Sequence, residues 1–259
     1  METPKPDPVA EIDKIIAGVL PRRVILRSLL LFQSLTGPEL RRDLSWGMEK
    51  YDEIGEKLFR DQAYWQLKDS FDQGINGVSD ALLYFNLKQL EISGLIIRER
   101  SEEEYKSKIA RINPRKIQHV RQYFRDIVPL ACITGFTEEE DKWQLTRLYQ
   151  KLRLTKLLNN QTVEDGKCYT IVPEGLKSKI SGGIPKEAII EISRKNLNYF
   201  EITKILREKI EDLLQPHEVI INITTGSRFF TIALTQLAFE YDLKMFYLDA
   251  NEKIVWLKD

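Results

Sequence analysis

The sequence predicts a two-part α/β protein, with a mainly helical N-terminal half and a C-terminal half built around a mostly parallel sheet. From about residue 11 to residue 126, apolar residues recur at helical spacing. From residue 128 onward, short β-branched runs alternate with amphipathic stretches of helical length. That alternation is typical of parallel strands joined by helices. We therefore place the domain boundary between residues 126 and 127.

Composition limits the class of protein. The chain has 259 residues, of which 42% are hydrophobic and 30% charged, as in an ordinary globular protein. No apolar run approaches the roughly 20 residues that span a bilayer, and the first residues lack the basic and apolar regions of a signal peptide. We therefore expect a cytoplasmic protein that does not bind membranes.

The reactive residues are few. Cys132 and Cys168 lie in apolar, strand-like runs, so we expect reduced core residues. The two histidines are far apart, and no Cys/His spacing suggests zinc, so we expect no metal site, no catalytic residue and no cofactor. Because 39 basic residues balance 39 acidic ones, nucleic-acid binding would need a local basic patch.

Helix boundaries mark three helices in the N-terminal half. Pro21 suits the first turn of a helix through PRRVILRSLLLFQSL, and Thr36 suits the N-cap of a helix that starts in TGPELRRDL. Ser79 is a suitable N-cap for a third helix that begins at Asp80 and ends near Gly94. Two strands around a polar turn follow, in RERSEEEYKSKIARINPRKI.

Basic residues lead away from the tip of this hairpin. Arg98 and Arg100 end its first strand, and we place Lys106, Lys108 and Arg111 of its second strand on one face. Cations on such a face can contact phosphates.

This order of helices and hairpin resembles a winged helix-turn-helix domain over residues 21–115, with SDALLYFNLKQLEISGLI as recognition helix and start of the wing. The resemblance implies binding of double-stranded DNA, with the third helix in the major groove. Alternatively, the domain serves dimerisation or protein contact. The implied DNA-binding residues are Ser79, Tyr84, Asn86, Lys88, Arg98, Arg100, Lys106, Lys108 and Arg111.

An aromatic-rich insert, residues 45–76, separates the second and third helices where a tight turn is usual. We expect it to be helical. It could dimerise, cover the DNA-facing surface, or bind a partner.

Six runs in the C-terminal half predict strands, and two of them end in polar residues. The six are VPLACITGF, CYTIVP, AIIEIS, VIINIT, KMFYLD and KIVWL. In open α/β sheets, ligands bind beyond the carboxyl ends of the strands. The first run ends in Thr134, Gly135, Phe136 and Thr137, where Gly135 would let the backbone approach a ligand.

The second polar strand end is the turn from Asn222 to Arg228, followed by an apolar helix. Free N–H groups at a helix start attract anions. The hydroxyls of Thr224, Thr225 and Ser227 can donate to an anion, and Arg228 can donate two bonds to a phosphate. Alternatively, the hydroxyls only cap the helix. The turn is not a Walker A loop, because the terminal Gly-Lys-[Ser/Thr] is absent.

The succession of these segments over residues 127–250 resembles the CRISPR-associated Rossmann fold (CARF) domain, a Rossmann-like sheet. The family motif is commonly Asn-x-Thr-Gly-Gly-Thr-Lys. Here Thr225 replaces the first glycine and Arg228 the lysine. A threonine there would narrow the approach to the backbone.

The resemblance implies that residues 127–259 form a homodimeric sensor of cyclic oligoadenylate, cyclic tetra-adenylate in particular, across a twofold axis. Residues 1–126 would then make the chain a CRISPR-linked transcriptional regulator. The alternatives are a ring nuclease, which is a metal-independent phosphodiesterase acting on the ligand, and a protein-interaction adaptor. The implied ligand-binding residues are Thr134, Gly135, Phe136, Thr137, Asn222, Thr224, Thr225, Gly226, Ser227 and Arg228.

Overall fold

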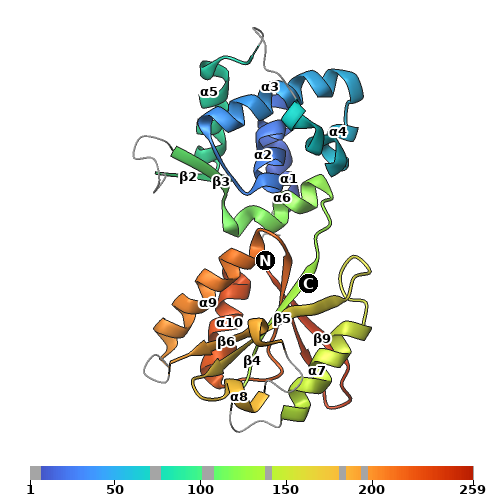
Figure 1. Ribbon diagram of the computed structural model, residues 1–259, viewed down its shortest axis with the longest axis vertical. Coiled ribbons are helices and arrows are strands. Elements are labelled where there is room, and N and C mark those ends of the chain that lie inside the picture. Colours follow the sequence, from blue (N-terminus) through green and yellow to red (C-terminus); the bar gives the residue numbers. More distant parts are fainter. Residues whose placement is uncertain are drawn as a thin grey trace, which may run out of the picture. The chain divides into compact units, whose positions relative to one another are not determined.

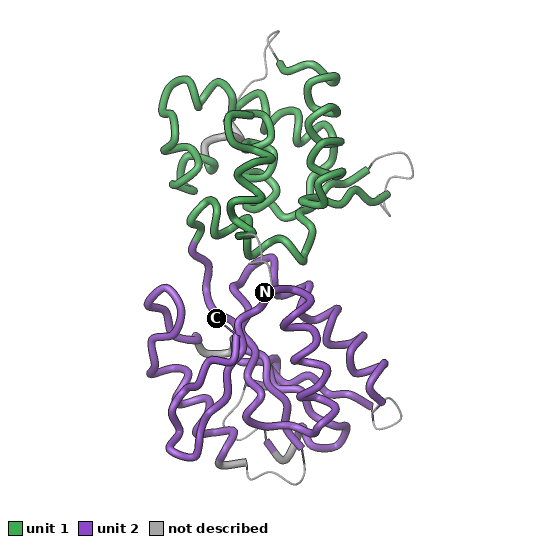
Figure 2. The backbone as a smooth tube through the Cα atoms, turned by 180° about the vertical axis from the view of Figure 1, so that it is seen from behind, with its two compact units in different colours: residues 1–126 green, residues 127–259 purple. Residues whose placement is uncertain are grey.

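The computed structural model describes residues 7–70, 77–100, 108–137, 142–180, 185–193 and 198–258. The chain divides into two compact units, unit 1 with residues 1–126 and unit 2 with residues 127–259 (Figure 2). Within the described ranges, no helix is both long and apolar enough to cross a membrane.

Unit 1 is mainly helical, and its core surrounds one central helix (Figure 1). This helix, α2, is buried from Val24 to Leu30 and packs against α1, α3, α5 and α6. The α-helices of the unit are α1 (Pro8–Ile16), α2 (Leu20–Phe32), α3 (Gly37–Ile54), α4 (Lys57–Arg60), α5 (Asp80–Ile92) and α6 (Ile117–Phe124), with 3₁₀ segments η1 (Gln62–Ser70) and η2 (Pro114–Lys116).

The predicted starts of the three helices are confirmed, but the first helix ends earlier than expected, because α2 stops at Phe32 and Ser34–Thr36 form strand β1. Pro21 lies in the first turn of α2. Thr36 precedes α3, and its amide donates to the Glu39 carboxylate at 2.7 Å, as in a capping box. Ser79 caps α5 by accepting from the amide of Leu82 at 3.2 Å. Gly94 follows α5 with a φ of 72°, the left-handed conformation typical of a helix end.

A small antiparallel sheet completes unit 1, with the strands in the order β1-β3-β2. The strands are β1 (Ser34–Thr36), β2 (Ile96–Arg100) and β3 (Lys108–Ile112). The hairpin of β2 and β3 is the one expected from the sequence.

The prediction that Lys106, Lys108 and Arg111 share one face is wrong. Lys108 and Arg111 are three residues apart, and side chains on a strand alternate with a period of two, so they point to opposite faces. Arg111 lies opposite Ile97, whereas Lys108 lies opposite Arg100. Lys106 is outside the described residues.

The described part of the insert folds back into unit 1. Helix α3 runs on to Ile54, and α4 and η1 follow. Trp46, Phe59 and Trp65 are buried, the rings of Trp46 and Trp65 lie 5.0 Å apart, and the ring of Phe59 stacks on Phe124 of α6 at 5.8 Å. These three aromatic residues therefore belong to the core of unit 1 and do not form an exposed surface for a partner.

Unit 2 is a six-stranded sheet with helices on both faces (Figure 1). All six predicted strands are present, and only β9 is antiparallel to its neighbour. The strands are β4 (Leu130–Gly135), β5 (Val163–Pro173), β6 (Ile189–Ile192), β7 (Glu218–Asn222), β8 (Lys244–Leu248) and β9 (Ile254–Lys258); the helices are α7 (Lys142–Leu154), α8 (Lys177–Ile180), α9 (Tyr199–Leu214) and α10 (Arg228–Glu240), with 3₁₀ segment η3 (Lys186–Ala188).

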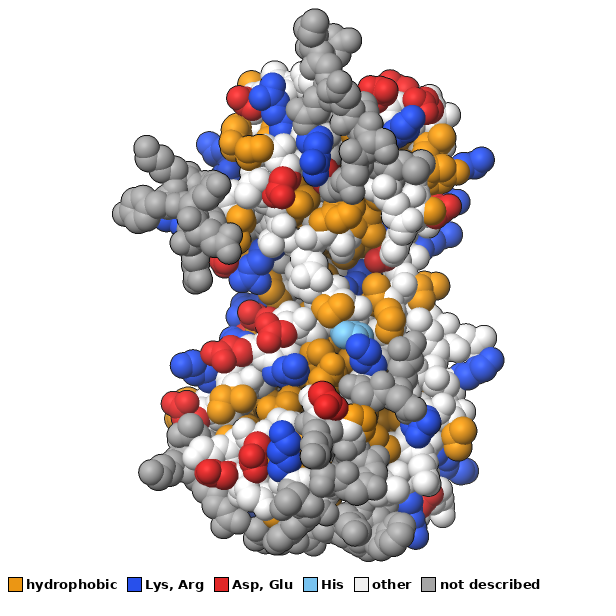
Figure 3. Space-filling model, viewed as in Figure 1, with side chains coloured by type: hydrophobic (Ala, Val, Ile, Leu, Met, Phe, Trp, Pro, Cys, Tyr) orange, Lys and Arg blue, Asp and Glu red, His pale blue; other side chains and the backbone are white. Residues whose placement is uncertain are grey.

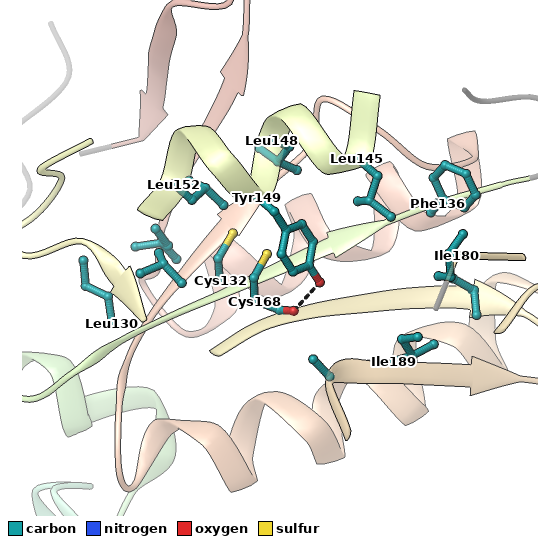
Figure 4. Close-up of a cluster of buried hydrophobic side chains, with 14 of the residues drawn as sticks. Leu130, Cys132, Phe136, Leu145, Leu148, Tyr149, Leu152, Cys168, Ile180 and Ile189 are labelled. Atoms are coloured by element: carbon teal, nitrogen blue, oxygen red, sulfur yellow. Dashed lines mark hydrogen bonds between the residues drawn. The ribbon is translucent and has the colours of Figure 1, made fainter. Parts of the chain in front are cut away.

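Side chains of successive strand residues point to opposite faces of the sheet, so each face has its own hydrophobic core. Cys132 and Cys168 lie under α7 in a cluster that includes Leu148 and Tyr149 (Figure 4). Both cysteines are free and buried, as expected. Ala131 and the other odd-numbered residues of β4 point to the opposite face, on which α9 and α10 pack against β7.

The sheet order fixes where the two polar strand ends meet. The order is β6-β5-β4-β7-β8-β9. From β4 the chain adds β5 and β6 on one side, and it then returns to add β7, β8 and β9 on the other. The topological switch point, where ligands bind in doubly wound sheets, therefore lies between β4 and β7.

Candidate functional site

The candidate site is the carboxyl edge of the sheet at β4 and β7. The two strands are parallel, with Leu130 opposite Glu218 and Ile133 opposite Ile221. In consequence the last residues of β4, Thr134 and Gly135, lie at the same edge as the turn that starts at Asn222, the last residue of β7. The structure thus brings together the two strand ends that the sequence singled out.

A buried polar cluster joins the two ends. The side chains of Thr134, Asn222 and Thr225 are all buried. The Thr134 hydroxyl donates to Oδ1 of Asn222 at 3.1 Å and lies 3.0 Å from the Thr225 hydroxyl. The Thr225 hydroxyl in turn donates to the carbonyl of Gly135 at 2.6 Å. Thr225 therefore faces inward, and its side chain does not narrow the outer face of the turn.

The two glycines of the site pack against each other. Gly226 has a φ of 110°, and a Cβ atom there would lie 3.0 Å from Cα of Gly135. A Cβ atom at Gly135 would lie 2.9 Å from the ring of Phe230. The absence of a side chain at Gly135 thus serves contact between the two loops, whereas the sequence suggested approach of a ligand.

Thr224 is the hydroxyl of the turn that faces outward. It is exposed, and its Oγ1 accepts from Nδ2 of Asn222 at 2.8 Å and from the amide of Leu248 at 2.7 Å. A hydroxyl has two acceptor lone pairs and one proton. Because both lone pairs are used, the hydroxyl of Thr224 can only donate to a ligand.

The start of α10 adds further donors. Ser227 caps the helix by accepting from the amide of Phe230 at 3.3 Å, so its own proton is left for another acceptor. Among the described residues, the amides of Arg228 and Phe229 have no hydrogen-bond partner, as expected in a first helical turn. The Arg228 side chain is exposed. The outer face of the turn is therefore rich in donors.

The end of β4 contributes less to this outer face. Phe136 is 4% exposed and packs in the core under α7, and its amide donates to the carbonyl of Ile171 at 2.9 Å. Thr137 is half-buried. Of the expected ligand-binding residues, Thr224, Ser227, Arg228 and part of Thr137 reach the surface, and Thr134, Phe136, Asn222 and Thr225 lie beneath it.

The cluster has a polar extension on β5 that was not predicted from the sequence. Thr170 lies opposite Thr134 in the sheet, and its hydroxyl is 2.7 Å from the hydroxyl of Tyr149. Tyr149 also donates to the carbonyl of Cys168 (Figure 4), and burial raises the pKa of Tyr149 far above its usual range. The threonine inside the apolar run CYTIVP is the feature of the sequence that could have indicated this extension.

The thiol next to the site, that of Cys132, is fully buried. Burial is the main cause that raises the pKa of Cys132 well above its ordinary value, and neighbouring Cys168 adds to the shift. A protonated, fully buried thiol is a core residue. Among the described residues, no three His, Cys, Asp or Glu side chains converge as metal ligands.

In unit 1, the expected DNA-binding residues of α5 separate into exposed and buried. Ser79 and Lys88 are exposed, and Tyr84 is 50% exposed. Asn86 is buried: it donates to the carbonyl of Leu82 at 2.8 Å and accepts from Nε of Arg22 at 3.3 Å. Asn86 thus holds α2 and α5 together from inside.

Ion pairs occupy several cations of this unit. Arg98 contacts Glu91 at 2.5 Å, Arg111 contacts Glu99 at 3.0 Å, and Arg41 contacts Asp80 at 3.2 Å. Lys88, Arg100 and Lys108 are exposed. Basic and acidic side chains are interspersed on the face drawn in Figure 3.

Comparison with known proteins gives little. No protein-family model matches the sequence, and no curated protein is significantly similar to it. Among solved structures, Can2 from Sulfobacillus thermosulfidooxidans in complex with cyclic tetra-adenylate matches with 15% sequence identity and a TM-score of 0.35. The match covers 49% of this chain and 34% of that chain. At this level the likeness says nothing about the ligand of the present chain.

Proposed function

We propose that this chain is a CRISPR-linked, ligand-responsive regulator: unit 2 binds a cyclic oligoadenylate at the ends of β4 and β7, and unit 1 is a winged helix that binds double-stranded DNA. The observation that carries the proposal is the coincidence of an outward-facing set of donors with the topological switch point of the sheet. In open α/β sheets this crevice is where nucleotide ligands bind.

The donor set favours an anion with several acceptor oxygens. The hydroxyls of Thr224 and Ser227 each keep a proton to donate, and among the described residues two amides at the start of α10 have no partner. Arg228 adds a fork of donors that matches two oxygens of one phosphate. A phosphodiester ligand satisfies this set. The resemblance of residues 222–228 to the CARF motif points to a cyclic oligoadenylate, with cyclic tetra-adenylate as the first ligand to test.

An exposed apolar stripe on α10 supports a homodimer. Phe229, Ile232 and Phe239 are 51%, 55% and 62% exposed, and their spacing places them on one face of the helix. The stripe begins next to the anion-binding turn. Self-association through it would create a twofold interface, and a cyclic ligand with twofold symmetry suits such an interface.

The ligand proposal is tested by calorimetry with the full chain and cyclic tetra- and hexa-adenylate. We expect binding by the parent and a loss of roughly 10- to 100-fold in Arg228→Ala, the size of a charge-assisted hydrogen bond. Arg153→Ala is the control, because Arg153 is also an exposed arginine but lies in the last turn of α7, outside the turn of residues 222–228. If neither ligand binds the parent, the sensor proposal fails. If chromatography shows that the ligand is cleaved, the protein is a ring nuclease.

The DNA proposal rests on the order of elements in unit 1. Helices α2, α3 and α5 are followed by the β2–β3 hairpin, and β1 pairs with β3, as in a winged helix-turn-helix domain. In such domains the third helix enters the major groove. The cations we assign to phosphate contact are Lys88 on α5 and Arg100 and Lys108, which lie opposite each other on the hairpin.

Salt dependence of DNA binding tests this assignment. Lys88→Gln with Lys108→Gln should reduce the slope of log K against log salt concentration by roughly 2, because each lost phosphate contact contributes about 0.9. Lys50→Gln is the control, since Lys50 already pairs with Glu53 at 2.7 Å. An unchanged slope in the double variant would reject the phosphate contacts.

A second candidate for unit 1 is a protein-interaction module. Helix α5 exposes Phe85 and Ile92, which are 58% and 69% exposed, beside Tyr84. Exposed apolar side chains on one helix often mark a protein contact. If the parent shows no salt-dependent retardation of its own upstream DNA, this candidate replaces DNA binding.

A further inference from the structure

Thr225 stands where the CARF motif has its first glycine, so its role is particular to this chain. If its side chain faced the ligand, it would narrow the approach to the backbone. The side chain is instead 3% exposed and lies between the two strand ends. The next residue, Gly226, packs against Gly135, where a Cβ atom on Gly226 would lie 3.0 Å from Cα of Gly135.

The hydroxyl of Thr225 connects segments that are 90 residues apart in the sequence. It donates to the Gly135 carbonyl at 2.6 Å and lies 3.0 Å from the Thr134 hydroxyl. Thr134 also donates to Asn222, which holds Thr224 through both its amide atoms. One connected set of polar groups therefore runs from the end of β4 to the outward-facing Thr224.

We infer that Thr225 is a positioning residue. Its hydroxyl bonds the end of β4 to the β7–α10 turn, residues 222–228, and we call this hydrogen bond the latch. The latch holds the outward-facing donors in place for the ligand anion. The inference rests on the proposed function, because it concerns the same turn. A turn that is held in its binding geometry before the ligand arrives loses less conformational entropy on binding, so the latch increases affinity without contacting the ligand.

The test uses three substitutions at this position and one matched control. Thr225→Val removes the hydroxyl with little change of shape, Thr225→Ser keeps it, and Thr225→Gly restores the family residue. Thr203→Val is the control, because Thr203 is 8% exposed and donates to the carbonyl of Tyr199 at 2.7 Å within α9. Affinity for cyclic tetra-adenylate is measured by calorimetry on the full chain. Hydrogen exchange of the amides in residues 223–229 is measured without ligand.

We expect Thr225→Val and Thr225→Gly to bind roughly tenfold more weakly, about the size of one lost hydrogen bond. Exchange in residues 223–229 should accelerate in both. Thr225→Ser should bind within about twofold of the parent, and Thr203→Val should change neither measurement in this segment.

Two results overturn the inference. One is tighter binding by Thr225→Gly, which would mean that the threonine obstructs the ligand. The other is Thr225→Val that binds and exchanges as the parent does. If the parent itself binds no cyclic oligoadenylate, the proposed function fails, and the exchange measurement alone still decides whether the latch exists.

Discussion

Gly226→Ala is expected to destabilise unit 2 more than Gly175→Ala, and the difference measures the contact between the two loops of the site. Both glycines have a positive φ, 110° and 88°, so each substitution introduces backbone strain of about 1–3 kcal/mol. A Cβ atom at Gly175 meets nothing within 4 Å, whereas one at Gly226 lies 3.0 Å from Cα of Gly135. Because backbone cannot turn aside, overpacking adds about 1–3 kcal/mol at Gly226 only. The expected losses are therefore about 2–6 and about 1–3 kcal/mol.

The assay must report on unit 2 alone, because a chain of two compact units need not unfold in one step. Hydrogen exchange of peptides from β4 and β7, followed at increasing urea concentrations, gives that local free energy of unfolding. Equal losses of unfolding free energy in Gly226→Ala and Gly175→Ala would refute the reasoning, since they would show that close packing of Gly226 on Gly135 adds no cost.

Three further predictions concern buried or paired groups. In unit 1, Asp126→Asn should cost about 3–5 kcal/mol in urea unfolding, because it leaves the buried guanidinium of Arg27 without its counter-ion. The hydrogen bond from Arg23 holds the pKa of Glu56 below its usual value. The ionised Glu56 therefore stabilises the folded state at pH values above the ordinary glutamate pKa of about 4.3, and this stabilisation is lost as the pH falls through the lower folded-state pKa. In Glu56→Gln, the melting temperature should therefore decline less steeply below about pH 5 than in the parent. Tyr149→Phe leaves a buried carbonyl without its donor and should cost about 1–3 kcal/mol in thermal unfolding.

Local signals in the sequence predicted the elements well, because those signals act within a few residues. The six strand runs of the C-terminal half were apolar and bounded by polar turns, and all six became strands. Thr36 and Ser79 were recognised as caps from their neighbours alone, and each is bonded within three residues. The alternation of strands and helices also predicted the mostly parallel sheet.

The direction of each side chain at the site depended on contacts that a single sequence does not display. Whether Thr225 faced the ligand or the core was decided by Gly135, and the purpose of Gly135 was decided by Gly226 and Phe230. The ion pair of Arg98 with Glu91 likewise required the packing of α5 against β2. The error over Lys108 and Arg111 was different, because a strand's period of two was sufficient to separate them.

The polar residues of the β7–α10 turn, residues 222–228, serve as a helix cap and also form the proposed anion site. Thr225 uses its proton inside the protein, on the Gly135 carbonyl. Thr224 has filled both its lone pairs, with the amides of Asn222 and Leu248, and Ser227 has accepted from Phe230. These contacts use the acceptor lone pairs of the two hydroxyls and leave their protons available to a ligand. Among the described residues, the amides of Arg228 and Phe229 in the first turn of α10 are also without a partner. The proposed anion site therefore depends on the same hydrogen bonds that stabilise the turn.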